Sequence, residues 1–109
     1  MATIYKVLGQ VKPAAVTATT LYTVPSATQA VASTIVICNL LATATPFRIA
    51  VRPSGAALSD LHYVAYDVTV GGSDSTALTL GITLQATDVI TVYSGSGNVS
   101  FSVFGSEIA

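Results

Sequence analysis

Asp60 and His62 come nearest to catalytic chemistry by residue type and spacing. They lie two positions apart in a strand-like segment, so both side chains would point to the same face of a strand. With one of the many serines they could form a Ser-His-Asp relay. However, the sequence contains no Gly-x-Ser-x-Gly motif and no strand-to-helix turn that would expose a nucleophile. We therefore predict a non-enzymatic protein without catalytic residues, and interpret His62 as a solvent- or interface-facing side chain.

Metal-ligating residues are few and scattered. The chain has one cysteine and one histidine, whereas a zinc site uses three or four Cys, His or carboxylate ligands. Asp74 follows a Gly-Gly-Ser turn signal, and Asp88 precedes a strand, where its side chain can bond to local backbone. Neither belongs to the Asp-x-Asp-x-Asp spacing of a calcium loop. We predict no metal and no cofactor, and expect Cys38 to be a small core residue without a disulfide partner.

Four side chains are candidates for contact with a partner. Arg48 and Arg52 share one face of an alternating strand, about 13 Å apart at ~3.3 Å per residue. They could pair with acidic groups of a partner protein, because arginine is enriched at interfaces. Strict alternation would place Tyr63 and Tyr66 on opposite faces of one strand, so that one of them faces outward. That tyrosine would pack at the edge of the core or form a carbohydrate- or partner-binding platform.

The composition favours a single domain, residues 1–109, whose surface is covered by neighbours. Of its 109 residues 51% are hydrophobic and only 8% are charged, with a net charge of −1, whereas a typical soluble domain has about 25% charged residues. Four scattered basic residues make no nucleic-acid-binding stripe. The densest apolar run, Ile35–Cys38, is far shorter than the ~20 residues that span a membrane. Because charges are depleted in permanent interfaces, we expect an assembly subunit.

An apolar-polar alternation of period two dominates the chain and predicts an all-β fold. Turn signals such as Gly71-Gly72-Ser73-Asp74 separate the strands at intervals of about 8–12 residues, which is typical of a sandwich or barrel. We expect a two-sheet sandwich of mostly antiparallel strands, jelly-roll-like or alternatively immunoglobulin-like. The eight predicted strands lie near residues 3–11, 17–24, 30–40, 46–53, 60–70, 75–84, 87–94 and 98–107.

Several short motifs together resemble small virion structural proteins of tailed bacteriophages, in particular phages of cyanobacteria. The motifs are Leu21–Pro25, Ser33–Asn39, Phe47–Pro53, Leu84–Tyr93 and the closing Val103–Ile108. The resemblance covers nearly the whole chain, although each motif alone is a generic β pattern. It implies a non-enzymatic β-sandwich subunit of the virus particle and carries no catalytic residues.

Taken together, these observations predict a capsid decoration (cement) protein on the outer surface of the shell. It would bind the major capsid protein and copies of itself, as a dimer or trimer, and neither nucleic acid nor membrane. Residues 1–10 would form an N-terminal arm or an edge strand that could extend a neighbour's sheet. The alternative is a tail fibre or baseplate subunit, or a host-glycan-binding module.

Overall fold

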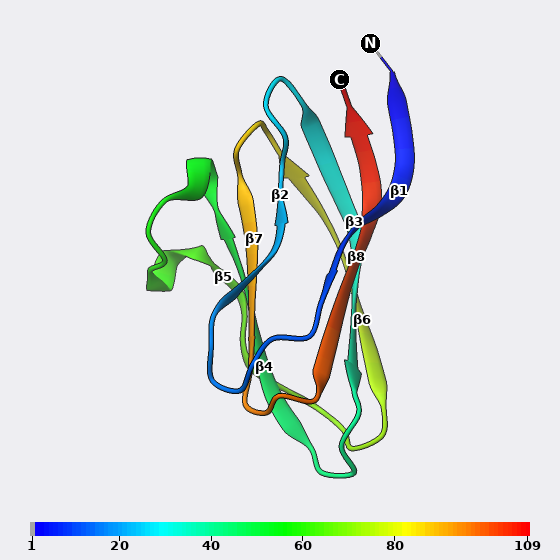
Figure 1. Ribbon diagram of the computed structural model, residues 1–109, viewed down its shortest axis with the longest axis vertical. Coiled ribbons are helices and arrows are strands. Elements are labelled where there is room, and N and C mark those ends of the chain that lie inside the picture. Colours follow the sequence, from blue (N-terminus) through cyan, green and yellow to red (C-terminus); the bar gives the residue numbers. More distant parts are fainter. Residues whose placement is uncertain (1) are drawn as a thin grey trace.

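The computed structural model describes residues 2–109 and consists of two four-stranded antiparallel sheets packed face to face (Figure 1). The all-β two-sheet sandwich is therefore confirmed, with every strand within a few residues of its expected position. Two short 3-10 turns, η1 (Pro53–Gly55) and η2 (Asp60–His62), project from one side of the sandwich. The strands are β1 (Thr3–Val11), β2 (Thr19–Thr23), β3 (Gln29–Asn39), β4 (Thr45–Arg52), β5 (Tyr63–Val70), β6 (Ser75–Leu84), β7 (Val89–Ser94) and β8 (Val99–Ile108).

The strand order is that of a jelly roll. One sheet has the order β1-β8-β3-β6 and the other the order β2-β7-β4-β5. The chain crosses between the sheets at every connection except β4 to β5, which is the double Greek-key arrangement of jelly rolls. The immunoglobulin-like alternative would keep its first two strands together in one sheet, whereas β1 and β2 lie in different sheets. No helix within residues 2–109 is long and apolar enough to cross a membrane.

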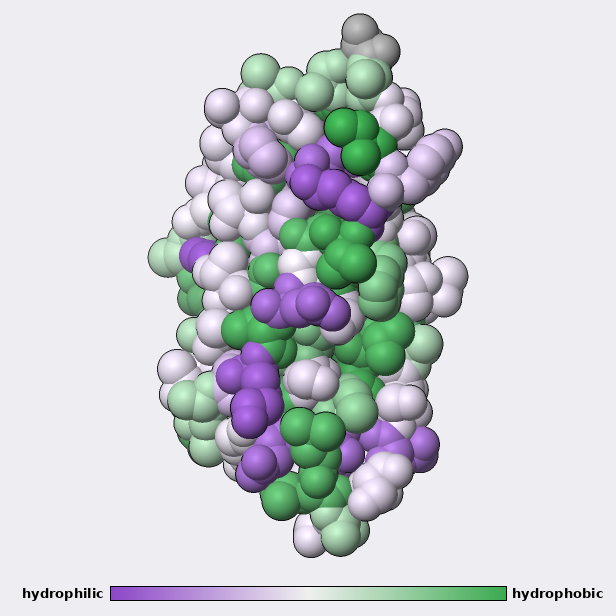
Figure 2. Space-filling view, turned by 45° about the vertical axis from the view of Figure 1, so that its right-hand side comes forward, coloured by the Kyte–Doolittle hydropathy of each residue, from purple (hydrophilic) through white to green (hydrophobic). Residues whose placement is uncertain are grey.

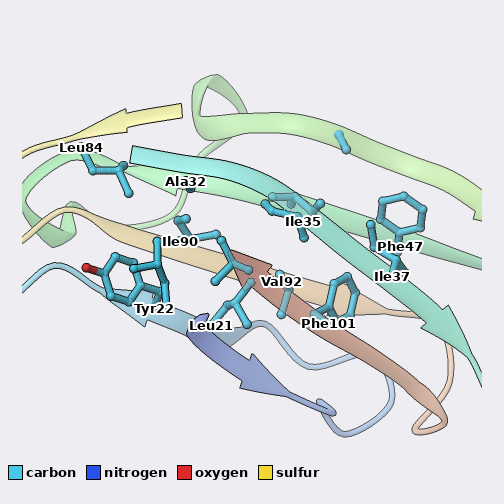
Figure 3. Packing of buried hydrophobic residues seen from close by; sticks show 14 of the residues in the cluster. Leu21, Tyr22, Ala32, Ile35, Ile37, Phe47, Leu84, Ile90, Val92 and Phe101 are labelled. Carbon is cyan, nitrogen blue, oxygen red and sulfur yellow. The ribbon is translucent and has the colours of Figure 1, made fainter. Parts of the chain in front are cut away.

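The core lies between the sheets and follows the predicted alternation. Phe47 of β4 and Phe101 of β8 meet at its centre, with ring centroids 6.2 Å apart and planes at 72° (Figure 3). Branched aliphatic side chains of both sheets surround the two rings. In β6, Leu84 is buried, but Leu80 is 48% exposed, contrary to strict alternation. The reason is a register shift in which two steps on β3 match three on β6, beside Gly81 with a φ of +63°.

One other expectation needs correction, and one left open is decided. Cys38 is only partly buried, because its register with Ser75 and Ser100 places it on the outer face of the β1-β8-β3-β6 sheet. The segment predicted as an N-terminal arm or edge strand is an edge strand, since β1 pairs with β8 over its whole length. Ala2 and Ala109 exchange backbone hydrogen bonds at the end of this ladder. Met1 lies outside the described residues.

A buried asparagine joins two turns at the other end of the sandwich. Asn39 is 2% exposed, and its Oδ1 accepts a 3.0 Å hydrogen bond from the Leu41 amide. Its Nδ2 donates to the Thr43 carbonyl at 2.8 Å and faces the carbonyls of Val70 and Gly71 at 3.4 and 3.3 Å. Asn39 therefore ties the β3–β4 turn to the β5–β6 turn.

Candidate functional site

Arg48 is stacked between two tyrosines on the outer face of the β2-β7-β4-β5 sheet. Its guanidinium carbon lies 4.1 Å from the ring centroid of Tyr66 on β5 and 4.3 Å from that of Tyr93 on β7. Tyr93 is the direct cross-strand partner of Arg48. A guanidinium over an aromatic face is attracted by the ring quadrupole. The two rings therefore form an intramolecular cation–π contact with the guanidinium of Arg48.

The acidic partner of Arg48 comes from the same chain. The Nε and Nη2 atoms of Arg48 donate to the two carboxylate oxygens of Asp67 at 2.7 and 3.3 Å. These hydrogen bonds raise the pKa of Arg48 and lower the pKa of the Asp67 carboxyl. A paired guanidinium has little charge left for a second carboxylate. The expected pairing of Arg48 with an acidic group of a partner protein is therefore not the role this geometry favours.

An irregularity of β5 brings the predicted tyrosines together. Ala50 pairs with Tyr63 whereas Ile49 pairs with Ala65, so one step on β4 matches two on β5. The extra residue shifts the alternation, which places Tyr63 and Tyr66 on the same face. Their rings are in edge contact, with centroids 4.9 Å apart and planes at 81°. The expectation that strict alternation would place these tyrosines on opposite faces is therefore wrong.

Asp60, Tyr63 and Tyr66 line a shallow pocket of about 310 Å³, which we call the tyrosine pocket. Asp60 belongs to η2, which directly precedes β5 and therefore lies beside the start of that strand. Tyr66 is 54% exposed. The two ion pairs found within residues 2–109 are Lys6–Glu107 and Arg48–Asp67, so neither of them neutralises Asp60.

Arg52 and His62 have structural contacts. Arg52 lies on the same strand face as Arg48, as predicted, but donates to the Thr91 hydroxyl at 3.0 Å and the Ala56 carbonyl at 2.9 Å, which fixes the loop after η1. His62 is buried and not solvent-facing, because its Nδ1 accepts a 3.1 Å hydrogen bond from the Ser59 amide in a 3-10 turn rather than a strand. No cluster of three or more potential metal ligands occurs within residues 2–109.

The outer face of the β1-β8-β3-β6 sheet carries no charged side chain among its described residues. Figure 2 views this face obliquely, together with an edge of the sandwich, and shows hydrophobic patches alternating with strongly hydrophilic residues. Tyr5, which is 83% exposed, lines with Val7, Val31 and Phe104 a groove of about 540 Å³ across this face, and Lys6 of the edge strand β1 also lines this groove. The outward positions form five rows across the strands: Thr3-Ile108-Gln29, Tyr5-Ser106-Val31-Thr83, Val7-Phe104-Thr34-Thr79, Gln10-Ser102-Val36-Ala77 and Ser100-Cys38-Ser75.

A small charged network lies at the edge of this sheet, between β1 and β8. Glu107 accepts a 2.5 Å hydrogen bond from the Tyr22 hydroxyl and forms a 2.9 Å ion pair with Lys6. The bond from Tyr22, followed by that from Lys6, lowers the pKa of the Glu107 carboxyl. Burial, followed by the bond to Glu107, raises the pKa of the Tyr22 phenol. The network links β2 of one sheet to β1 and β8 of the other.

Acidification is expected to remove the contribution of this network to stability. Because the pKa of Glu107 is lower in the folded chain than in the unfolded one, its stabilisation is fully present above about pH 4.5 and is lost as the pH falls through the lowered value. Thermal unfolding of the wild type and Glu107→Gln between pH 7 and pH 2 measures this effect. The melting temperatures of the two proteins should converge in acid. A constant difference across this range would contradict the prediction.

Three of the four predicted contact residues thus meet on one face. Arg48 contacts Tyr66, and Tyr66 contacts Tyr63. Arg52 lies further along β4. Sequence reasoning missed the roles of Asp67 and Tyr93, because only the pairing of β4 with β5 and β7 places them beside Arg48. No protein-family model matches the chain, and no curated protein matches it in sequence.

Proposed function

We propose that the protein is a non-enzymatic structural subunit of a tailed-bacteriophage particle, a capsid decoration protein. It would bind between major capsid subunits on the outer surface of the shell as a homodimer. A ligand that binds only the assembled lattice stabilises it by mass action, and several weak contacts per subunit add up through multivalency. The observation that carries the proposal is the charge-free outer face of the β1-β8-β3-β6 sheet.

The size and chemistry of this face support its contact with a second copy of the chain. Four strands of about ten residues, at ~3.3 Å per residue and ~4.8 Å between strands, present roughly 600 Å². Two such faces bury about 1,200 Å², the lower end of a standard interface. In a two-fold dimer the same patch meets itself, so a face without charges has no like-charge repulsion. Its exposed Tyr5 and Phe104 are residue types enriched in interface cores.

The fold and the sequence motifs give further support by analogy. Jelly rolls build viral capsid domains as well as lectins, and one fold serves many functions. The likeness of the sequence motifs to small virion proteins favours the first of these two uses. Dimerisation through the β1-β8-β3-β6 face would leave the opposite face, with Arg48 and the tyrosine pocket, available for the capsid.

The copy number of the protein in purified particles tests the proposal. We expect hundreds of copies per particle by gel densitometry against the major capsid protein, and shells that become heat-labile when the protein is lost. The purified protein should have the mass of a dimer in solution and should bind shells that lack it. A monomer in solution would refute the dimer, and failure to bind such shells would refute the cement function.

The second candidate is a tail fibre or baseplate subunit, or a host-glycan-binding module. The tyrosine pocket favours it, because exposed aromatic rings beside a carboxylate are groups that bind sugars. This alternative predicts a few to a few dozen copies that remain with isolated tails. It also predicts that the isolated protein binds a sugar.

A further inference from the structure

The tyrosine pocket has the chemistry of a cation-binding site. The rings of Tyr63 and Tyr66 stand almost at right angles in edge contact, and both line the pocket. The faces of aromatic rings are negative and attract ammonium and guanidinium groups. Asp60 adds a carboxylate to the lining of the same pocket. A cation in this pocket would contact the aromatic walls that Tyr63 and Tyr66 provide and a negative charge.

The charges around the pocket also favour a cation. Arg48, which stacks on Tyr66, is neutralised by its ion pair with Asp67. Arg52 donates its hydrogen bonds to Thr91 and Ala56, and neither of the two ion pairs includes Asp60. The exposed carboxylate of Asp60 therefore has no ion-pair partner within residues 2–109 and can pair with a cation from outside. An anionic ligand would be repelled by it.

A flat sugar ring fits this pocket less well. A pyranose stacks over a whole aromatic face, whereas Tyr66 already contacts Arg48 and the ring of Tyr63. The volume of about 310 Å³ lies at the lower end of the ~300–1,000 Å³ that is usual for ligand pockets. This space suits one side chain better than an oligosaccharide.

We propose that the tyrosine pocket receives a lysine or arginine side chain of a neighbouring major capsid subunit. This inference rests on the proposed function and names the contact through which the decoration protein recognises the shell. Asp60 is the charge partner, and Tyr63 and Tyr66 are the aromatic walls. Within the chain, Arg48 stacks on the rings of Tyr66 and Tyr93 and pairs with Asp67. The proposed contact between two chains would combine the same kinds of group: a cation, two tyrosine rings and a carboxylate.

Nuclear magnetic resonance titration with matched probes tests the pocket alone. Nα-acetyl-lysine N-methylamide is compared with the norleucine analogue, which keeps the aliphatic chain but lacks the ammonium group, and with methyl α-glucopyranoside. We expect the lysine probe to shift the ring signals of Tyr63 and Tyr66 and to bind about fivefold or more tightly than the norleucine probe. Equal binding of the two probes would refute the proposal, and binding of the glucoside instead would favour the glycan-binding alternative.

Two variants locate the effect. Asp60→Asn should weaken binding of the lysine probe about threefold to fivefold, and Tyr63→Leu should weaken it as well. Asp74→Asn is the matched control, because Asp74 lies in the turn after β5, at the opposite end of that strand from Tyr63. Thermal unfolding of each variant verifies its fold. If Asp60→Asn remains folded and binds the lysine probe like the wild type, the pocket is not the site.

The outcomes separate this inference from the function on which it rests. Hundreds of copies per particle together with no binding of the lysine probe would refute the cation pocket and keep the decoration function. Selective binding of the lysine probe by a protein that is absent from shells would refute the decoration function and keep the pocket.

Discussion

Phe101→Ala is expected to lower the free energy of unfolding by about 3–5 kcal/mol. Phe101 is fully buried and makes edge contact with Phe47 at the centre of the core. Its removal leaves a cavity on the inner side of β8, a central strand held between β1 and β3. A domain of this size has about 5–15 kcal/mol of stability in total. The melting temperature should therefore fall by roughly 12 °C or more, at about 4 °C or more per kcal/mol.

Phe104→Ala is the matched control for this substitution. Phe104 lies three residues further along β8, on the outer face, and is 37% exposed. Phe104→Ala removes the same kind of side chain from the same strand without opening a core cavity. The substitution should therefore lower the free energy of unfolding by less than about 1.5 kcal/mol. Urea unfolding of both variants at low protein concentration measures the difference. Equal losses would show that Phe101 does not occupy the centre of the core.

Replacement of Asn39 should have the second large effect. Asn39→Ala removes the bonds to Leu41 and Thr43 and leaves buried backbone groups without partners, at about 1–3 kcal/mol for each unsatisfied group. Asn39→Asp should cost at least as much at pH 7, because it turns a carboxylate toward carbonyl oxygens. Burial among carbonyls raises the pKa of an introduced carboxyl. The difference in stability between Asn39→Asp and the wild type should therefore shrink as the pH falls toward 4.

Asn98 provides the control, since it is an exposed turn residue of the same type. Asn98→Ala should change the free energy of unfolding by less than about 0.5 kcal/mol. The measurement is urea unfolding of the three variants at pH 7 and pH 4. If Asn39→Ala costs no more than Asn98→Ala, the two turns at this end are held together by other contacts.

The alternation of apolar and polar residues was enough to predict the sandwich. In the first five residues of β4 and of β8 the buried residues, such as Phe47 and Val103, occur at every second position, because each strand has one face on the core. The strand order was not determined by this pattern, since alternation depends only on which face is buried. Only the pairing of the strands in the structure distinguishes the jelly-roll order from the immunoglobulin-like order.

The candidate site was predicted in its residue types but not in its geometry. Arginines on one predicted strand and tyrosines on another were separate candidates for a contact, and Arg48, Tyr63 and Tyr66 do meet. Their meeting depends on a one-residue irregularity opposite Ile49 and Ala50. A bulge reverses the direction of every following side chain. No local sequence signal marks this one, since Val64, the unpaired residue, is not typical of a bulge.

The position of β8 has a consequence for the synthesis of the protein. β8 lies between β1 and β3, yet it is the last strand of the eight to leave the ribosome. Until it arrives, β1 has no neighbour in its sheet, and β3 has only β6. A nascent chain thus exposes open strand edges that carry few charges, and such edges promote aggregation. We therefore expect folding to complete only once β8 has emerged, and slowly, since the pairs of β8 with β1 and β3 join distant parts of the chain.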